Sequence, residues 1–122
     1  MIIAADSTPL IHLSTVSDLG LLQKLSGRIL IPEAVRGEIV AGGPGLMRQA
    51  HFLLMDERRA VTHARFLGIE VLRTLGIYDY AKRLGLIKAV RPKIDALRQQ
   101  GFWLSEKDYQ EAIRSFGEHD PQ

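Results

Sequence analysis

Four short, mostly apolar runs are the feature that most restricts the fold of this chain. They occupy residues 2–5, 28–31, 52–55 and 69–72. Each has the length of a short strand, and runs without regular apolar–polar alternation are typical of strands buried on both faces. Helical patterns lie between these runs. This alternation predicts an α/β fold in three layers, with a short central parallel sheet between helices.

Capping residues and apolar spacing indicate where the helices lie. Thr8 is predicted to cap the first helix with Pro9 as its first residue, because proline is favoured there. Ser105 is predicted to begin the last helix as a capping residue. Further helices are expected over residues 16–25, 32–41, 57–67, 75–84, 91–100 and 105–116.

Three other segments complete the predicted organisation. The sequence GGPG at residues 42–45 resembles a linker, and residues 118–122 are expected to fray. Phe102 and Trp103 are expected to lie in the core or to pack against a helix, and not to form a stacking platform. With 122 residues, the chain is expected to form one domain over residues 1–122, with a helical C-terminal part at 75–117.

The composition narrows the classes of protein and site. The chain has no cysteine, which excludes disulfides and cysteine-ligated zinc. We expect no membrane span and no export signal, and a cytoplasmic location is the simplest expectation. The four histidines show no metal-ligand spacing, and no glycine-rich phosphate loop follows a strand.

Charge is distributed unevenly along the chain. Residues 58–98 contain ten Lys or Arg and three Asp or Glu, a local charge of +7, whereas the whole chain carries +2. Such a block is typical either of a surface that binds a polyanion or of solvated helix faces. Arg58, Arg59 and Arg65 on the helix at 57–67 are the candidates for holding a phosphate backbone.

Three carboxylates stand near the ends of predicted elements. Asp6 and Asp56 each follow a predicted strand, and Glu38 shares the apolar side of its helix. Ligands of open parallel sheets bind beyond the carboxyl ends of the strands, so these acids are expected to face one crevice. Taken singly, Asp56 also fits a helix cap and Glu38 a solvated position. Asp6 is not expected to be a cap, because Thr8 already fills that role.

Together the three acids predict a cation site. Clustered carboxylates bind hard cations such as Mg²⁺ or Mn²⁺ through oxygen. Such an ion activates water and stabilises the transition state of phosphoryl transfer. Asp6, Glu38 and Asp56 are therefore the candidate metal-binding and catalytic residues.

Most of the chain resembles the PIN domain family. The resemblance lies in IIAADSTPLIHL, RILIPEAVRGEIV and FLLMDERRAVTHARFLGIEV, and most specifically in TLGIYDYAKRLGLIKAVRPKIDALRQQGFWLS. The nearest resemblance is to a VapC-like toxin subfamily of predicted nucleic-acid-binding proteins. It implies a Rossmann-like parallel sheet and an Mg²⁺- or Mn²⁺-dependent endoribonuclease. Asp6, Glu38 and Asp56 match the family's acids, and Ser7 matches the small hydroxyl residue beside the first acid.

The resemblance also implies partners. VapC-type toxins act on RNA, are inhibited by a small antitoxin protein and often form homodimers. No membrane partner is implied.

The chain departs from the family pattern between residues 42 and 51. The family has a further helix acid before the FLLMD-like strand, whereas no acid lies between Glu38 and Asp56 in this chain. A strand and much of a helix are missing from the pattern, so the domain is expected to be shortened there. Glu57 is a candidate substitute, but as the residue next to Asp56 it is expected to point elsewhere. The alternative to a ribonuclease is therefore a catalytically impaired PIN-like module that binds nucleic acid or a partner protein.

Overall fold

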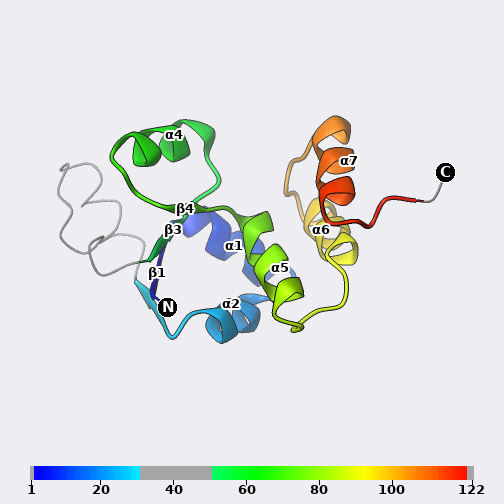
Figure 1. Cartoon of the computed structure of the whole chain (residues 1–122), viewed down its shortest axis with the longest axis horizontal. Coiled ribbons are helices and arrows are strands. Elements are labelled where there is room, and N and C mark those ends of the chain that lie inside the picture. Colours follow the sequence, from blue (N-terminus) through cyan, green and yellow to red (C-terminus); the bar gives the residue numbers. More distant parts are fainter. Residues whose placement is uncertain (1, 31–50, 121–122) are drawn as a thin grey trace.

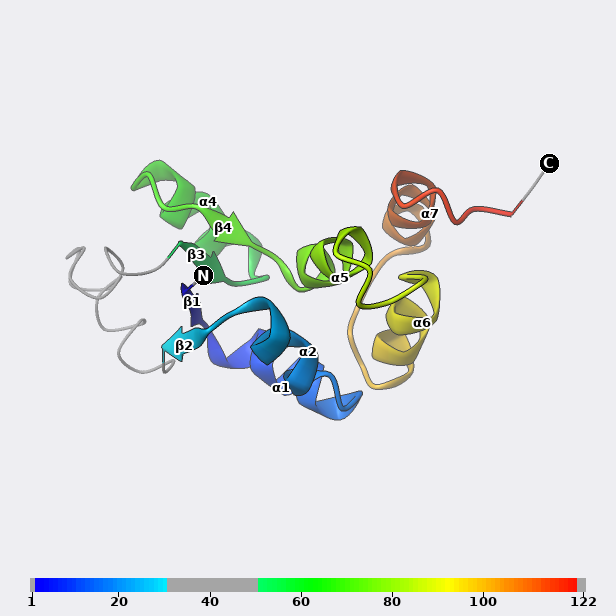
Figure 2. The same cartoon turned by 60° about the horizontal axis from the view of Figure 1, so that its bottom comes forward.

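A single parallel sheet organises the computed structural model, which describes residues 2–30 and 51–120. The strands lie in the order β2-β1-β3-β4, and every pair of neighbours is parallel (Figures 1 and 2). The strands are β1 (Ile2–Ala5), β2 (Arg28–Leu30), β3 (Phe52–Leu54) and β4 (Val71–Leu72). The helices are α1 (Ser7–Thr15), α2 (Leu19–Leu25), α4 (Arg58–Phe66), α5 (Thr74–Arg83), α6 (Arg91–Gln99) and α7 (Glu106–Ser115).

Helices cover both faces of this sheet, as the sequence predicts. Alternate strand residues point to opposite faces. Ala4 and Leu53 pack with Val61 and Ala64 of α4 on one face. The other face meets α1, α2 and α5, and α5 lies between the sheet and the pair α6 and α7 (Figure 2). The three-layer α/β/α prediction is thus confirmed.

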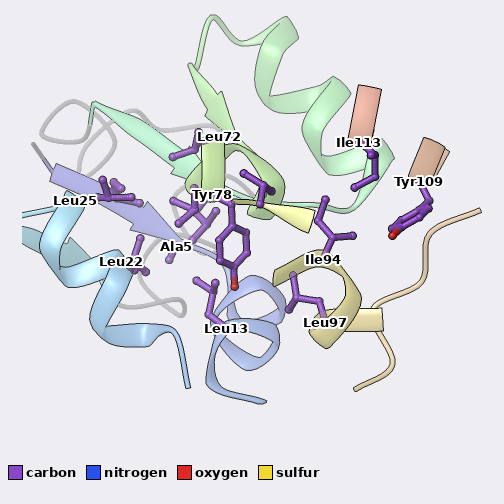
Figure 3. Close-up of a cluster of buried hydrophobic side chains, with 14 residues drawn as sticks. Ala5, Leu13, Leu22, Leu25, Leu72, Tyr78, Ile94, Leu97, Tyr109 and Ile113 are labelled. Atoms are coloured by element: carbon purple, nitrogen blue, oxygen red, sulfur yellow. The ribbon is translucent and has the colours of Figure 1, made fainter. Parts of the chain in front are cut away.

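The larger core is centred on Tyr78 of α5. Its ring is fully buried among residues from the sheet and from α1, α2 and α6 (Figure 3). Its hydroxyl donates a hydrogen bond of 2.7 Å to buried Asp18, which also accepts 3.1 Å from Lys93. Burial, followed by the bond to Asp18, raises the pKa of Tyr78 well above its ordinary value. The protonated hydroxyl therefore ties α5 to the start of α2, and Lys93 connects α6 to the same carboxylate.

The strands and the later helices lie close to their predicted places. The first strand is confirmed over its whole length, whereas the fourth is shortened to Val71–Leu72. Ser105 caps α7 as predicted, accepting 3.1 Å from the backbone N–H of Asp108. The predicted helix at 32–41 and the GGPG segment lie outside the described residues.

The predicted start of the second helix is wrong. It was expected at residue 16, but α1 continues to Thr15 and α2 begins at Leu19. Between the two helices, Ser17 has a φ of 60°, a left-handed conformation that interrupts a right-handed helix. The leucines behind the prediction, at positions 19, 22 and 25, all lie within α2 and carry no information on residues 16–18.

Two expectations for the C-terminal part, those for Trp103 and Glu118, are also wrong. Trp103 is 81% exposed and does not belong to the core. Phe102 packs as predicted, since it is partly buried against the core and meets the ring of His12 edge-on at 4.9 Å. Glu118 does not fray. Its carboxylate accepts the backbone N–H groups of Val90 and Arg91 at the start of α6, and the Lys82 ammonium at 2.8 Å.

Glu118 thus supplies the cap that α6 lacks locally, since Val90 has no side-chain capping bond. Burial alone would raise the pKa of Glu118. The hydrogen bonds from Lys82, Val90 and Arg91 outweigh burial and lower this pKa below its ordinary value of 4.5. The charged form therefore stabilises the fold. This stabilisation is complete above about pH 4.5 and is lost as the pH falls through the lowered pKa.

Glu118→Gln should lower the free energy of unfolding by about 1–2 kcal/mol at pH 7, because it removes the charge that caps α6. The variant should also lose part of the acid dependence below about pH 4.5. Urea denaturation followed by circular dichroism at pH 7 and pH 3.5 measures both effects. Glu111→Gln, on the exposed surface of α7, is the matched control and should change stability little. Equal effects of the two substitutions would contradict the capping role.

Candidate functional site

Asp6 and Asp56 lie at the same edge of the sheet. Asp6 follows β1 directly, and Asp56 lies two residues beyond β3. These strands are parallel neighbours with Ala5 paired to Leu54, and the backbone N–H of Asp6 donates 2.9 Å to the carbonyl of Leu54. The structure therefore places both acids at the carboxyl ends of adjacent strands, the usual ligand edge of an open parallel sheet.

Asp6 is the N-cap of α1, which corrects the prediction that Thr8 caps this helix. The Asp6 carboxylate accepts 2.9 Å from the backbone N–H of Ser7, and the helix begins at Ser7. Thr8 and Pro9 lie inside its first turn. Proline is tolerated there because the first backbone N–H groups of a helix have no partner within it. Asp6 thus has a structural role in addition to any role in chemistry.

Asp56 is held by the start of α5. One carboxylate oxygen accepts 2.9 Å from the backbone N–H of Thr74, and the other accepts the Thr74 hydroxyl. The Arg73 guanidinium donates 2.8 Å to the Asp56 carbonyl, and its Nε lies 4.0 Å from the carboxylate. The side chain of Asp56 is 17% exposed. A carboxylate that follows β3 therefore caps a helix that begins 18 residues later in the sequence.

Glu57, not Asp56, caps α4. Its carboxylate accepts the backbone N–H groups of Arg59 at 3.2 Å and Ala60 at 2.6 Å. The alternative prediction, that Asp56 caps the helix directly after it in the sequence, is therefore wrong. The Glu57 carboxylate is thus bonded to the first turn of α4. Arg58 and Arg59 belong to this turn, so they lie next to the edge of the sheet at which the strands end.

The three candidate arginines of α4 are all exposed but do not share one end of the helix. Arg58 and Arg59 lie in the first turn, beside the residue that follows Asp56. Arg65 lies in the last turn. At 1.5 Å per residue, Arg65 is about 10 Å further along the helix axis than Arg58. The candidate site thus includes Arg58 and Arg59 more directly than Arg65.

Sequence reasoning missed Arg73 and Thr74. They directly follow β4, which is the neighbour of β3 in the sheet. The rule that identified Asp6 and Asp56, polar residues after parallel strands, applies to them equally. Arg73 is half-exposed at 51%, and a guanidinium at this position has the donors to bind a phosphate.

The third predicted acid, Glu38, lies outside the described residues. Within residues 2–30 and 51–120, no three carboxylate or imidazole groups lie close enough to hold a metal ion together. In the same part of the chain, no helix is long and apolar enough to span a bilayer. The described part of the candidate site thus consists of two acids with a cationic neighbour.

Comparison with known proteins gives one family match. A family described as a PIN domain matches the chain in two segments, residues 2–50 and residues 45–118. Neither the curated proteins nor the solved structures contain a significant match. The matched segments include all four strands and every residue discussed at the carboxyl edge.

The two acids should differ in their effect on stability. Asp56→Ala removes the cap of α5 and leaves the fully buried Thr74 hydroxyl without its acceptor, so we expect a loss of about 2 kcal/mol. Asp6→Asn should cost less than half as much, since asparagine and aspartate are equally good N-caps. Urea denaturation of the two variants checks this order. A larger loss for Asp6→Asn would contradict the assigned roles.

Proposed function

Because this chain belongs to the PIN domain family, we propose that it is a metal-dependent endoribonuclease of the VapC toxin type. Asp6, Glu38 and Asp56 would hold Mg²⁺ or Mn²⁺ and are the proposed catalytic residues. The observation that carries this proposal is the position of Asp6 and Asp56 after neighbouring parallel strands. The substrate is RNA, and the bond cleaved is a phosphodiester.

The donor set at this edge fits a hard cation. Carboxylate oxygens are the preferred protein ligands of Mg²⁺, which is commonly held by one or two carboxylates together with substrate phosphates. Each oxygen of Asp56 accepts one hydrogen bond from Thr74, and a carboxylate oxygen has two lone pairs. When bound, the cation would activate a water molecule and stabilise charge on the phosphate.

The other residues at this edge have supporting roles in the proposal. The backbone N–H of Ser7 orients the Asp6 carboxylate. Glu57 fixes the first turn of α4, from which Arg58 and Arg59 would hold the phosphate backbone of RNA. The excess of positive charge over residues 58–98 would raise the local concentration of RNA.

A second candidate function is RNA or partner binding without cleavage. The family match is divided into two segments that overlap at residues 45–50, and this division supports the proposal that the domain is shortened there. No acid lies between Glu38 and Asp56, so one carboxylate of the family pattern has no counterpart. Asp6 and Asp56 both have helix-capping roles that do not require catalysis.

The proposal extends to partners and location. A small antitoxin protein and a second copy of this chain are the proposed protein partners, and the cytoplasm is the proposed location.

Purified protein should cleave structured RNA in the presence of Mn²⁺ or Mg²⁺, and Asp6→Asn should reduce the rate at least 100-fold. This substitution removes a metal-binding charge but retains a good N-cap, so loss of folding does not explain the result. Gel electrophoresis of labelled RNA with and without EDTA measures the activity.

The controls separate the two candidate functions. Equal cleavage by wild type and Asp6→Asn would identify a contaminating nuclease. If wild-type protein binds RNA but leaves it intact with either metal, the nuclease proposal fails and the binding module replaces it.

The double substitution Arg58→Gln and Arg59→Gln should weaken RNA binding about tenfold, whereas Arg65→Gln should change it less than threefold. The reason is the greater distance of Arg65 from the carboxyl edge. Fluorescence anisotropy in EDTA measures binding without cleavage. Each lost phosphate contact should reduce the slope of log affinity against log salt by about 0.7. A larger effect of Arg65→Gln would place the RNA elsewhere on α4.

A further inference from the structure

Thr74 makes an unusually complete set of contacts with one of the proposed metal-binding acids. Its side chain is fully buried, although Thr74 begins α5 just beyond the carboxyl end of β4. Its backbone N–H bonds one oxygen of Asp56, and its hydroxyl bonds the other. Both carboxylate oxygens are thus fixed by one residue, which leaves the carboxyl plane little freedom to rotate.

The sheet register explains why these two residues meet. Leu54 of β3 pairs with Leu72 of β4, and Met55 extends the pairing by donating 3.0 Å to the Leu72 carbonyl. Asp56 and Thr74 each lie two residues beyond that pair. Arg73 secures the turn by donating to the Asp56 carbonyl. The contact is therefore built into the ends of two adjacent strands.

We propose that Thr74 is a positioning residue whose hydroxyl orients the Asp56 carboxylate for cation binding. This inference rests on the proposed function, because it takes Asp56 as a ligand of Mg²⁺ or Mn²⁺. Hydrogen bonds to a metal-ligating carboxylate fix its direction, and their loss typically weakens metal binding 10–100-fold. Thr74 touches neither metal nor RNA and acts through Asp56.

A purely structural role for Thr74 makes a different prediction. If the contact serves only to begin α5, removing the hydroxyl lowers the melting temperature and leaves the metal affinity of the folded protein unchanged. Metal affinity therefore distinguishes positioning from capping, and a serine at this position retains the hydroxyl needed for positioning.

The test is calorimetric titration of the metal-free full chain with Mn²⁺ alone, at a temperature where each variant is folded. Thr74→Val should weaken Mn²⁺ binding about tenfold, and Thr74→Ser should remain within about threefold of wild type. Thr15→Val is the matched control, since its hydroxyl bonds the carbonyl of His12 at the far end of α1. It should leave Mn²⁺ affinity unchanged.

A second variant covers the case in which Thr74→Val does not fold. Thr74→Ala places a good helix former at the start of α5 and should show the same loss of affinity. Unchanged Mn²⁺ affinity in the folded hydroxyl-free variant would overturn the inference, as would absence of Mn²⁺ binding by wild type.

The two proposals can fail separately. A tenfold weakening of Mn²⁺ binding without RNA cleavage by wild type would support the role of Thr74 and refute the nuclease. Cleavage by wild type with unchanged Mn²⁺ affinity in Thr74→Val would support the nuclease and refute the positioning role.

Discussion

The parallel pairing of β1 with β3 is the interaction on which the candidate site depends. It joins residues 2–5 to residues 52–54 at the centre of the described sheet. Because both strands run in the same direction, the residues that follow them emerge at one edge. A shift of the register by one residue would reverse which side chains face α4 and would separate Asp6 from Asp56. Strand pairing therefore determines where the two acids lie, and the chemistry of their side chains then determines what they could bind.

Asp56 connects this edge to the helical C-terminal part. Its carboxylate begins α5 through Thr74, and α5 carries Tyr78 into the core. Tyr78 and Lys93 meet on Asp18, so α2, α5 and α6 share one buried carboxylate. Glu118 then fixes α6 from the opposite end of the chain. A ligand that binds Asp56 would change the contact by which this carboxylate begins α5. Ligand binding at the candidate site and the stability of α5 are therefore thermodynamically linked.

The regular parts of the fold were predictable because they depend on local patterns. Apolar runs identified the strands, and Ser105 identified the start of α7. The errors arose where distant contacts decide the outcome. Thr8 and Asp6 both satisfy the local rule for an N-cap, and the choice between them depends on where β1 ends. Glu118 has no helical or strand pattern, and its burial follows from the position of α6. No local sequence pattern predicts that the start of α6 is capped by a residue 28 positions further along the chain.

The site was predictable in part, and what was missed alters its interpretation. The rule for strand ends predicted that Asp6 and Asp56 lie at one edge of the sheet, where the structure has them, but it also holds for the residues after β4, which were missed. Thr74 and Arg73 show that Asp56 is needed to begin α5, just as Asp6 begins α1. Both acids would therefore stabilise helix starts even in a chain without catalytic activity. The side chains of Arg58 and Arg59 are exposed and make no hydrogen bond to the described residues, so folding does not explain them. The exposed arginines of α4 fit a solvated helix face as well as a bound polyanion, so neither the acids nor the arginines taken alone separate the two candidate functions.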